Sequence, residues 1–169
     1  MEYISAPWRG PYVRRVCRMR GCVFCRALRV GDDRAALILF RGEHNFIILN
    51  KFPYTPGHLM IAPFRHTAAF DRLSPEVSSE MVRLLQLSLR ILKKTSRPNG
   101  FNAGMNLGQS AGAGVVGHCH LHIIPRWHGD SNFMPLVSQT RVLIEDLART
   151  YDRLRPLFQK EERRTRRKQ

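Results

Sequence analysis

A chain of 169 residues has the length of a single domain and can bury a proper hydrophobic core. Its formal net charge of +15 is the strongest departure from ordinary composition and indicates an anionic substrate or partner. Because no run approaches the ~18 apolar residues of a membrane span, and no secretory signal pattern opens the chain, we expect no membrane association and a cytoplasmic location.

The charge is concentrated at the two ends. Residues 1–34 carry eight arginines against three acids, and residues 160–169 carry six lysines or arginines against two. The tail, residues 159–169, is therefore predicted to be solvated and disordered. Nucleic-acid contact through phosphates is one interpretation of these basic ends. It is not favoured, because no aromatic residues are interleaved with the charges and an anionic substrate also explains a positive field.

The basic segment 1–34 contains a Cys-x-x-Cys pair, Cys22 and Cys25. This spacing is typical of half a zinc site, in which two thiolates form one knuckle. Two further ligands are needed, and the candidates are His44, His58, His66, His118 and His128. A redox dithiol is the alternative, but a thioredoxin-like context is absent. Four unevenly spaced cysteines fit a reducing compartment better than a disulfide scaffold.

Residues 35–158 alternate between strand and helix patterns and are predicted to form the main domain. About five strands are expected, at Ala35–Arg41, His44–Asn50, Gly57–Pro63, Phe101–Leu107 and Cys119–Pro125. The first two flank Arg41-Gly42-Glu43, which predicts a hairpin. Together with the helices described next, these strands indicate an α+β domain whose helices pack on an antiparallel sheet.

One long helix is predicted to begin at Ser74-Pro75-Glu76, with serine at the N-cap and proline in the first turn. It is expected to stop within Ser96–Gly100. A second, more charged helix is predicted over 140–157. The long helix carries a core-facing stripe at helical spacing, formed by Val77, Met81, Leu84, Leu85, Ser88, Ile91 and Leu92.

Three histidines alternate in the segment Gly117–Pro125. On a strand, His118, His120 and His122 share one face at a spacing of about 7 Å, and Cys119 faces the core. The glycine-rich run 106–117 comes directly before them, and successive backbone N–H groups in such a run can form a nest for phosphate. Together the two features suggest a phosphate held by the loop while an imidazole nitrogen attacks it.

These residues resemble the histidine triad (HIT) signature, His-φ-His-φ-His-φ-φ. Residues 50–63 and 102–108 resemble the family's upstream strands, whereas 125–133 and 6–9 resemble its diadenosine tetraphosphate phosphorylases. The resemblance covers residues 6–145. It implies a HIT-like fold, a homodimer, and an enzyme that cleaves dinucleoside polyphosphates through a nucleotidyl–histidine intermediate.

The resemblance also implies roles for individual residues. His120 is the nucleophile, His122 binds the phosphate or protonates the leaving group, and the carbonyl of His118 fixes the His120 tautomer. Loop N–H groups, from Ala113, Gly114, Val115 and Val116, stabilise the equatorial oxygens. Further nucleotide or phosphate contacts are implied for Asn50, His58, Asn106 and Trp127. For the two asparagines, capping of a turn or strand end is the alternative.

Zinc-containing HIT proteins place their third ligand eight residues after the Gly-His of the upstream strand and their fourth at the first triad histidine. Here Gly57-His58 is followed eight residues later by His66, and the first triad histidine is His118. The resemblance therefore implies a structural zinc ion with four protein ligands, Cys22, Cys25, His66 and His118. His118 must then lean away from the row that strand alternation predicts.

One departure from the family pattern concerns the second substrate. Hydrolytic members often carry Gln or Ser four or three residues before the first triad histidine, where this chain has Gly114 and Val115. Phosphorolysis is therefore slightly preferred over hydrolysis, with Gln109 or Ser110 as substitutes from farther along the loop. The alternatives are a purine nucleoside phosphoramidase and a non-catalytic nucleotide- or nucleic-acid-binding protein.

Overall fold

The computed structural model describes residues 21–130 and 145–166, with side chains up to residue 161. The elements, in chain order, are α2 (Val23–Arg29), α3 (Asp33–Ala36), β1 (Ile38–Arg41), β2 (Asn45–Leu49), β3 (Leu59–Pro63), the 3-10 helix η1 (Phe70–Arg72), α4 (Pro75–Ser96), β4 (Gly100–Met105), β5 (Leu121–Arg126) and α6 (Leu147–Arg166). Within the described ranges, every helix is too short or too polar to cross a lipid bilayer.

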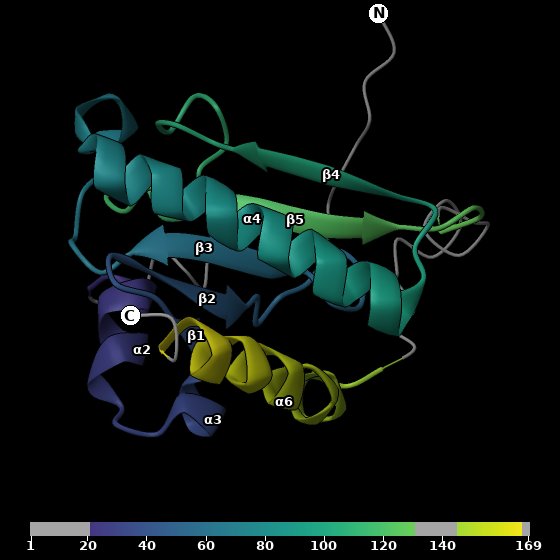
Figure 1. The fold of residues 1–169 in the computed structure, drawn as a ribbon. Coiled ribbons are helices and arrows are strands. Elements are labelled where there is room, and N and C mark those ends of the chain that lie inside the picture. The colour runs from purple at the N-terminus through teal and green to yellow at the C-terminus, as the bar shows by residue number, and fades with distance from the viewer. Residues whose placement is uncertain (1–20, 131–144, 167–169) are drawn as a thin grey trace, which may run out of the picture.

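The five strands form one antiparallel sheet in the order β1-β2-β3-β5-β4 (Figure 1). The central strands β2 and β3 are buried at every position, which explains their continuous apolar sequences. Leu59 to Ile61 of β3 pair with Ile123 to Leu121 of β5, so the segment that precedes β5 lies beside the end of β3. The predicted α+β class and its antiparallel sheet are confirmed.

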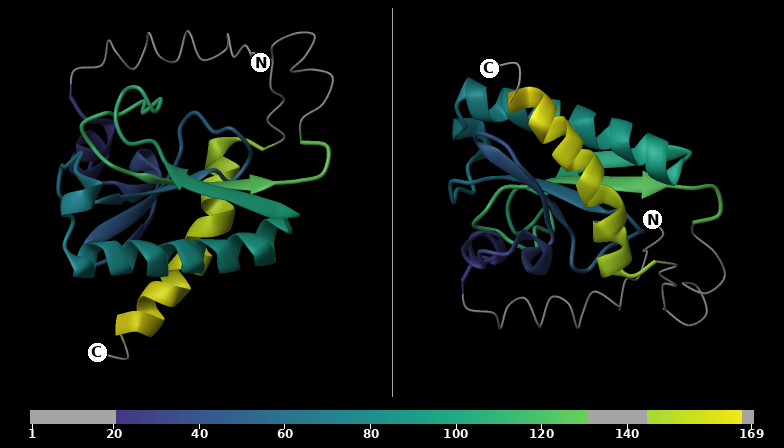
Figure 2. Two further views of the ribbon diagram at one scale, coloured as in Figure 1. Left: turned by 90° about the horizontal axis from the view of Figure 1, so that it is seen from above. Right: turned by 60° about the horizontal axis from the view of Figure 1, so that its bottom comes forward.

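Each face of the sheet carries its own hydrophobic cluster. The larger cluster joins α4 and α6 to one face and includes Leu49, Leu92 and Phe158. The smaller cluster packs Phe24 of α2 on the opposite face. His122 is the register partner of Met60, a member of the smaller cluster, so both project from that second face. Figure 2 shows α4 on one side of the sheet and α2 with the β4–β5 loop on the other.

The two edge strands of the sheet differ in what covers them. At the β1 edge, α6 donates hydrogen bonds to the strand, from the Tyr151 hydroxyl to the Ile38 carbonyl at 3.1 Å and from Arg155 to the Leu39 carbonyl at 2.6 Å. At the β4 edge, the residues from Asn102 to Gly104 are exposed. An exposed edge strand is a surface on which another strand can pair.

Helix α4 begins and ends where the sequence predicts, with Ser74 at the N-cap and Arg97 in the left-handed region (φ 45°) at the C-cap. Most of the predicted stripe is buried, but Val77 and Leu85 are half-buried, and Leu87 is buried although it lies outside the predicted stripe. Glu80 is buried with this stripe because its carboxylate accepts backbone N–H bonds from Glu43, His44 and Asn45 at 2.7, 2.9 and 2.8 Å. These bonds compensate the buried charge and tie α4 to the β1–β2 turn.

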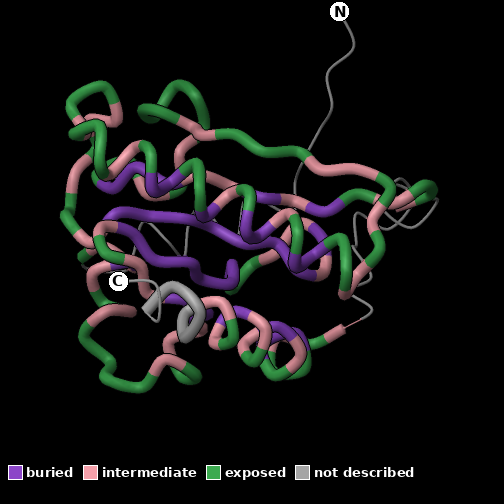
Figure 3. The backbone as a smooth tube through the Cα atoms, in the orientation of Figure 1, coloured by how far each residue is buried: buried purple, intermediate pink, exposed green. Residues whose placement is uncertain are grey.

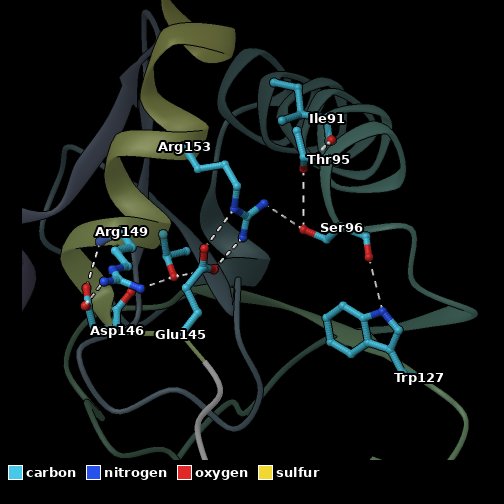
Figure 4. A network of polar contacts seen from close by, with 9 residues as sticks. Ile91, Thr95, Ser96, Trp127, Glu145, Asp146, Arg149 and Arg153 are labelled. Atoms are coloured by element: carbon cyan, nitrogen blue, oxygen red, sulfur yellow. Dashed lines mark hydrogen bonds and ion pairs between the residues drawn. The ribbon is translucent and has the colours of Figure 1, made fainter.

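A polar joint holds the C-terminal end of α4 against α6 and the end of β5 (Figure 4). The Trp127 indole N–H donates to the Ser96 carbonyl at 3.2 Å, which satisfies one terminal carbonyl of α4. The Ser96 hydroxyl accepts from Arg153 at 2.9 Å, and Arg153 pairs with Glu145 at 2.6 Å. The joint fixes where α6 crosses the end of α4.

Several strand boundaries shift by one or two residues, and three differences have a clear structural cause or consequence. The strand predicted over Ala35–Arg41 is first a helical turn, since the Asp32 carboxylate caps α3, and Leu37 (φ 62°) redirects the chain before β1. Strand β5 begins at Leu121, so the residues from 118 to 120 precede it. Finally, α6 continues through Arg166, and residues 159–166 of the predicted disordered tail are helical. The expected helix start at 140 lies outside the described residues.

Candidate active site and metal centre

The three histidines do not form the uniform row that strand alternation predicts. The Cys119 N–H donates to the Thr67 carbonyl at 2.7 Å, which holds the segment before β5 against the loop that follows β3. His118 and His120 are buried, and His122 is half-buried at the start of β5. His118 turns away from the other two, as the zinc hypothesis requires, whereas the rings of His120 and His122 stay side by side, with centroids 4.7 Å apart.

His118 turns toward the two N-terminal cysteines. The ligand atoms of Cys22, Cys25, His66 and His118 all lie within 4.8 Å of one another. Cys22 is the N-cap of α2 and Cys25 lies in its first turn, so the helix presents both thiols on one side. The Cys22 sulfur is 3.3 Å from His118 Nδ1, and the Cys25 sulfur is 3.4 Å from His66 Nδ1. The four residues from three distant segments are brought together.

The chemistry of this donor set fits a tetrahedral zinc ion. Two sulfurs and two imidazole nitrogens form a closed Cys2His2 ligand set. The His118 Nε2–H donates to the Pro63 carbonyl at 2.9 Å, which leaves the Nδ1 lone pair directed at the sulfurs. Burial, and after it Cys22, raises the pKa of the Cys25 thiol, and a bound cation is the group that would reverse this effect.

His120 has the opposite arrangement of its ring nitrogens. Its Nδ1–H donates to the His118 carbonyl at 2.8 Å, as the resemblance implies. The Nε2 lone pair is therefore available, and no described residue is hydrogen-bonded to it. Burial lowers the pKa of His120 below its ordinary value, so the ring is neutral at physiological pH. A neutral imidazole with an unprotonated Nε2 is chemically a nucleophile.

A chain of hydrogen bonds sets the proton position on His122. The Tyr54 backbone N–H can only donate, and it donates to His58 Nδ1 at 3.1 Å. His58 therefore carries its proton on Nε2, which is 3.0 Å from His122 Nδ1. His122 in turn keeps its proton on Nε2. Burial, and after it the charges of His122 and His120, lowers the pKa of His58 to about 3, which keeps this link neutral.

Phe24 forms a wall shared by the two clusters. It lies between the two cysteines in sequence, is 1% exposed, and packs in the smaller hydrophobic cluster. Its ring centroid is 5.1 Å from that of His118 and 4.9 Å from that of His120. The Cys-x-x-Cys segment therefore places the apolar Phe24 ring against the imidazole of His120, the candidate nucleophile. Sequence reasoning missed this role, because a Phe within Cys-x-x-Cys carries no signal of its own.

The glycine-rich loop offers backbone donors, but not all of those expected. The Ala113 N–H donates to the Gly108 carbonyl at 3.3 Å and is therefore engaged within the loop. The N–H groups of Gly114, Val115 and Val116 have no hydrogen-bond acceptor among the described residues. These three amides are the ones that can bind an anion without breaking a loop contact.

The remaining expected contacts are spread more widely. The side-chain Oδ1 of Asn50 accepts the Phe52 backbone N–H at 2.9 Å, which is the turn-capping arrangement considered as its alternative. Asn106 lies at the base of the loop, with Nδ2 3.5 Å from the Gly112 carbonyl. Trp127 follows β5 at the end opposite His122 and belongs to the α4–α6 joint (Figure 4). The structure brings the first two toward the histidines and loop but leaves Trp127 apart.

The chain is similar to known proteins in sequence and in structure. The model of the HIT domain matches residues 33–129. An AP-4-A phosphorylase of Mycobacterium tuberculosis is 40% identical over 112 residues, which cover 66% of this chain and 57% of that protein. An uncharacterized HIT-like protein of Saccharolobus solfataricus is 31% identical over 128 residues, covering 73% of this chain and 90% of its own.

The solved structures include a Zn-bound histidine triad family protein from Mycobacterium smegmatis. Its TM-score is 0.67 at 26% sequence identity, and the match covers 84% of this chain and 96% of that one. Among the sequence relatives, in contrast, the chain spans little more than half the length of the AP-4-A phosphorylase.

Proposed function

The chain belongs to the HIT family, and on that premise we propose that it is an enzyme that cleaves dinucleoside polyphosphates such as diadenosine tetraphosphate. The relative named AP-4-A phosphorylase supports this substrate class. The observation that carries the proposal is the tautomer pattern at the site. His120 offers an unprotonated Nε2, whereas the bonds around His122 keep a proton on its Nε2. One nucleophile and one proton donor thus lie side by side, with ring centroids 4.7 Å apart.

In the proposed first step, His120 Nε2 attacks the α-phosphorus of the substrate. A P–N bond forms and the P–O bond to the leaving nucleotide breaks, which gives a nucleotidyl–histidine intermediate. The His122 Nε2–H donates its proton to the departing oxygen. The His118 carbonyl accepts the His120 Nδ1–H throughout and stabilises the positive charge that develops on the ring.

Backbone donors are proposed to hold the reacting phosphate. The backbone N–H groups of Gly114, Val115 and Val116, which have no acceptor among the described residues, are the proposed donors to the equatorial oxygens. Negative charge grows on these oxygens in the transition state. Asn50, Asn106, Ala113 and Trp127 stay predictions as nucleotide contacts, with Ala113 the weaker donor because its N–H is already bonded.

In the second step an acceptor attacks the phosphorus and the P–N bond breaks. We propose that phosphate is favoured over water as this acceptor, because Gly114 and Val115 provide no polar side chain that could direct a water molecule. The attacking oxygen of the acceptor gives its proton to His122 Nε2, so the second step restores neutral His120 and protonated His122 Nε2 and releases the nucleotide with the acceptor attached.

A structural zinc ion at Cys22, Cys25, His66 and His118 completes the proposal. Zinc with four protein ligands supplies no open position, so its chemistry is to hold α2 against the catalytic segment. The family's homodimer is carried over as part of the proposal, and the exposed β4 edge supports it. The three cysteines that the structure describes form no disulfide, which supports the predicted cytoplasmic location.

The test is incubation of the full chain with diadenosine tetraphosphate, with and without inorganic phosphate, and separation of the products. ADP together with ATP, formed only when phosphate is present, is the expected result. AMP together with ATP without phosphate would replace phosphorolysis by hydrolysis. Turnover of an adenosine phosphoramidate with no turnover of the dinucleotide would overturn the proposed substrate class.

A further inference from the structure

Helix α4 carries a row of exposed positive charges along its outer face. Arg83, Arg90 and Arg97 recur at intervals of seven residues, which places them on one side of the helix and about 10.5 Å apart along its axis. Lys93 and Lys94 lie between the last two and are also exposed. We call these five residues the α4 basic row. Figure 3 shows the exposed positions alternating with the buried ones along α4.

Among the described residues, no acidic side chain pairs with the row. After Glu76 in the first turn, the only acid of α4 is Glu80, which is buried and bonded to the β1–β2 turn. No described carboxylate lies within ion-pair distance of any member of the row. Helix α6 differs, since three of its arginines form ion pairs with acidic residues: Arg149 with Asp146, Arg153 with Glu145, and Arg155 with Asp33.

Neither the fold nor the proposed reaction accounts for the row. Lys93 and Lys94 lie in the last turn of α4, where a cation complements the helix dipole. Arg83 and Arg90, however, lie farther from that end, and like charges on one helix face repel each other. The core is held by the opposite face of α4, which contains Leu84 and Ile91. The histidine site projects from the other face of the sheet, as the pairing of Met60 with His122 establishes. The row therefore points to a polyanion other than the substrate.

We propose that the α4 basic row binds the phosphate backbone of double-helical nucleic acid, independently of base sequence. From Arg83 to Arg97 the row is about 21 Å long, and a duplex carries one charge per about 1.7 Å of its axis, so each side chain of the row can reach a phosphate. Single-strand sites combine cations with aromatic side chains on which bases stack. Helix α4 contains no aromatic residue, which favours the duplex.

The test measures binding of the full chain to a fluorescent 20-base-pair duplex by anisotropy at several salt concentrations. In R83Q/R90Q, two charges are removed while helix propensity is kept. The slope of log K against log salt should become shallower by about 1.8, and affinity near 0.1 M salt should fall by roughly tenfold or more. The matched control, R29Q/K51Q, removes two exposed charges outside α4 and should leave the slope unchanged.

Two other outcomes would overturn the proposal. Equal slopes for both variants would mean that net charge alone attracts the duplex. Tighter binding to phosphatidylserine vesicles than to the duplex, lost in R83Q/R90Q, would assign the row to an anionic membrane surface instead. Circular dichroism and the melting temperature verify that both variants are folded. None of these measurements depends on turnover, so the proposed function can fail while this inference stands.

Discussion

Two histidine clusters share the segment from His118 to His122, and they differ in which ring nitrogen the backbone occupies. In the cysteine–histidine cluster, the Pro63 carbonyl takes the His118 Nε2–H and leaves Nδ1 for a metal. In the cluster of His120, His122 and His58, the His118 carbonyl takes the His120 Nδ1–H and leaves Nε2 for the proposed attack on phosphorus. Residues two positions apart thus have opposite tautomers, because different carbonyls accept from them.

The two clusters also differ in whether they leave atoms available to bind a substrate. The first gathers four ligand atoms within 4.8 Å and leaves no position for a substrate. The second has one occupied nitrogen on His120 and three loop amides without an acceptor nearby. The residue type does not decide the chemistry here. The partner of the second ring nitrogen decides it. The predictions change one cluster and leave the other in place, except the last, which changes the Phe24 ring that both clusters share.

The largest effect is expected for His120→Ala. Removal of the nucleophile should lower kcat by roughly 10⁴-fold or more, because no other group can form the covalent intermediate. Steady-state turnover of diadenosine tetraphosphate measures the loss, and calorimetry should show that nucleotide still binds. The matched variant His66→Ala removes a histidine from the other cluster. An equal loss of kcat in both variants, with zinc retained in His66→Ala, would contradict the assignment of His120 to catalysis and of His66 to the metal.

Cys25→Ser should release the metal without touching the nucleophile. We expect the zinc content to fall from one ion per chain to almost none, and the free energy of unfolding to fall by about 3 kcal/mol or more, since bound zinc contributes directly to folding. Plasma emission spectroscopy and thermal melts measure the two quantities. Cys119→Ala removes a buried thiol that belongs to neither cluster, so this variant should bind as much zinc as the wild type. A wild-type protein purified without metal contradicts the prediction.

Stability should depend on pH through His58. Its pKa is about 3 in the folded protein, far below the ordinary value of 6.5, so between these values the unfolded chain binds the extra proton. The stability that it contributes is complete above pH 6.5 and is lost as pH falls, by roughly 3 kcal/mol at pH 4. Urea unfolding across this range should show the slope in the wild type. An unchanged slope in His58→Gln would assign it to other groups.

The sequence predicts the sheet and the long helix well, because apolar runs and the Ser74-Pro75 start depend on local preferences. It also predicts that Cys22, Cys25, His66 and His118 meet, although only through a family resemblance. Where it fails, the cause is tertiary. Asp32 caps a helical turn inside an apparent strand, and Cys119 bonds to Thr67 so that His118 turns out of the row. Local patterns carry no information on such partners.

Phe24→Leu should produce the smallest change and test whether the clusters communicate through their shared wall. The centroid of the Phe24 ring is 4.9 Å from that of His120 and 5.1 Å from that of His118. A smaller side chain therefore loosens the packing of both imidazoles without removing a proposed ligand or nucleophile. We expect a stability loss of about 1 kcal/mol, retained zinc, and kcat lower by roughly tenfold at unchanged KM. Phe46→Leu is the control, since Phe46 contacts Phe24 at 6.3 Å within the same hydrophobic cluster. It should lose similar stability at normal kcat, whereas equal kcat values for both variants would mean that Phe24 is packing alone.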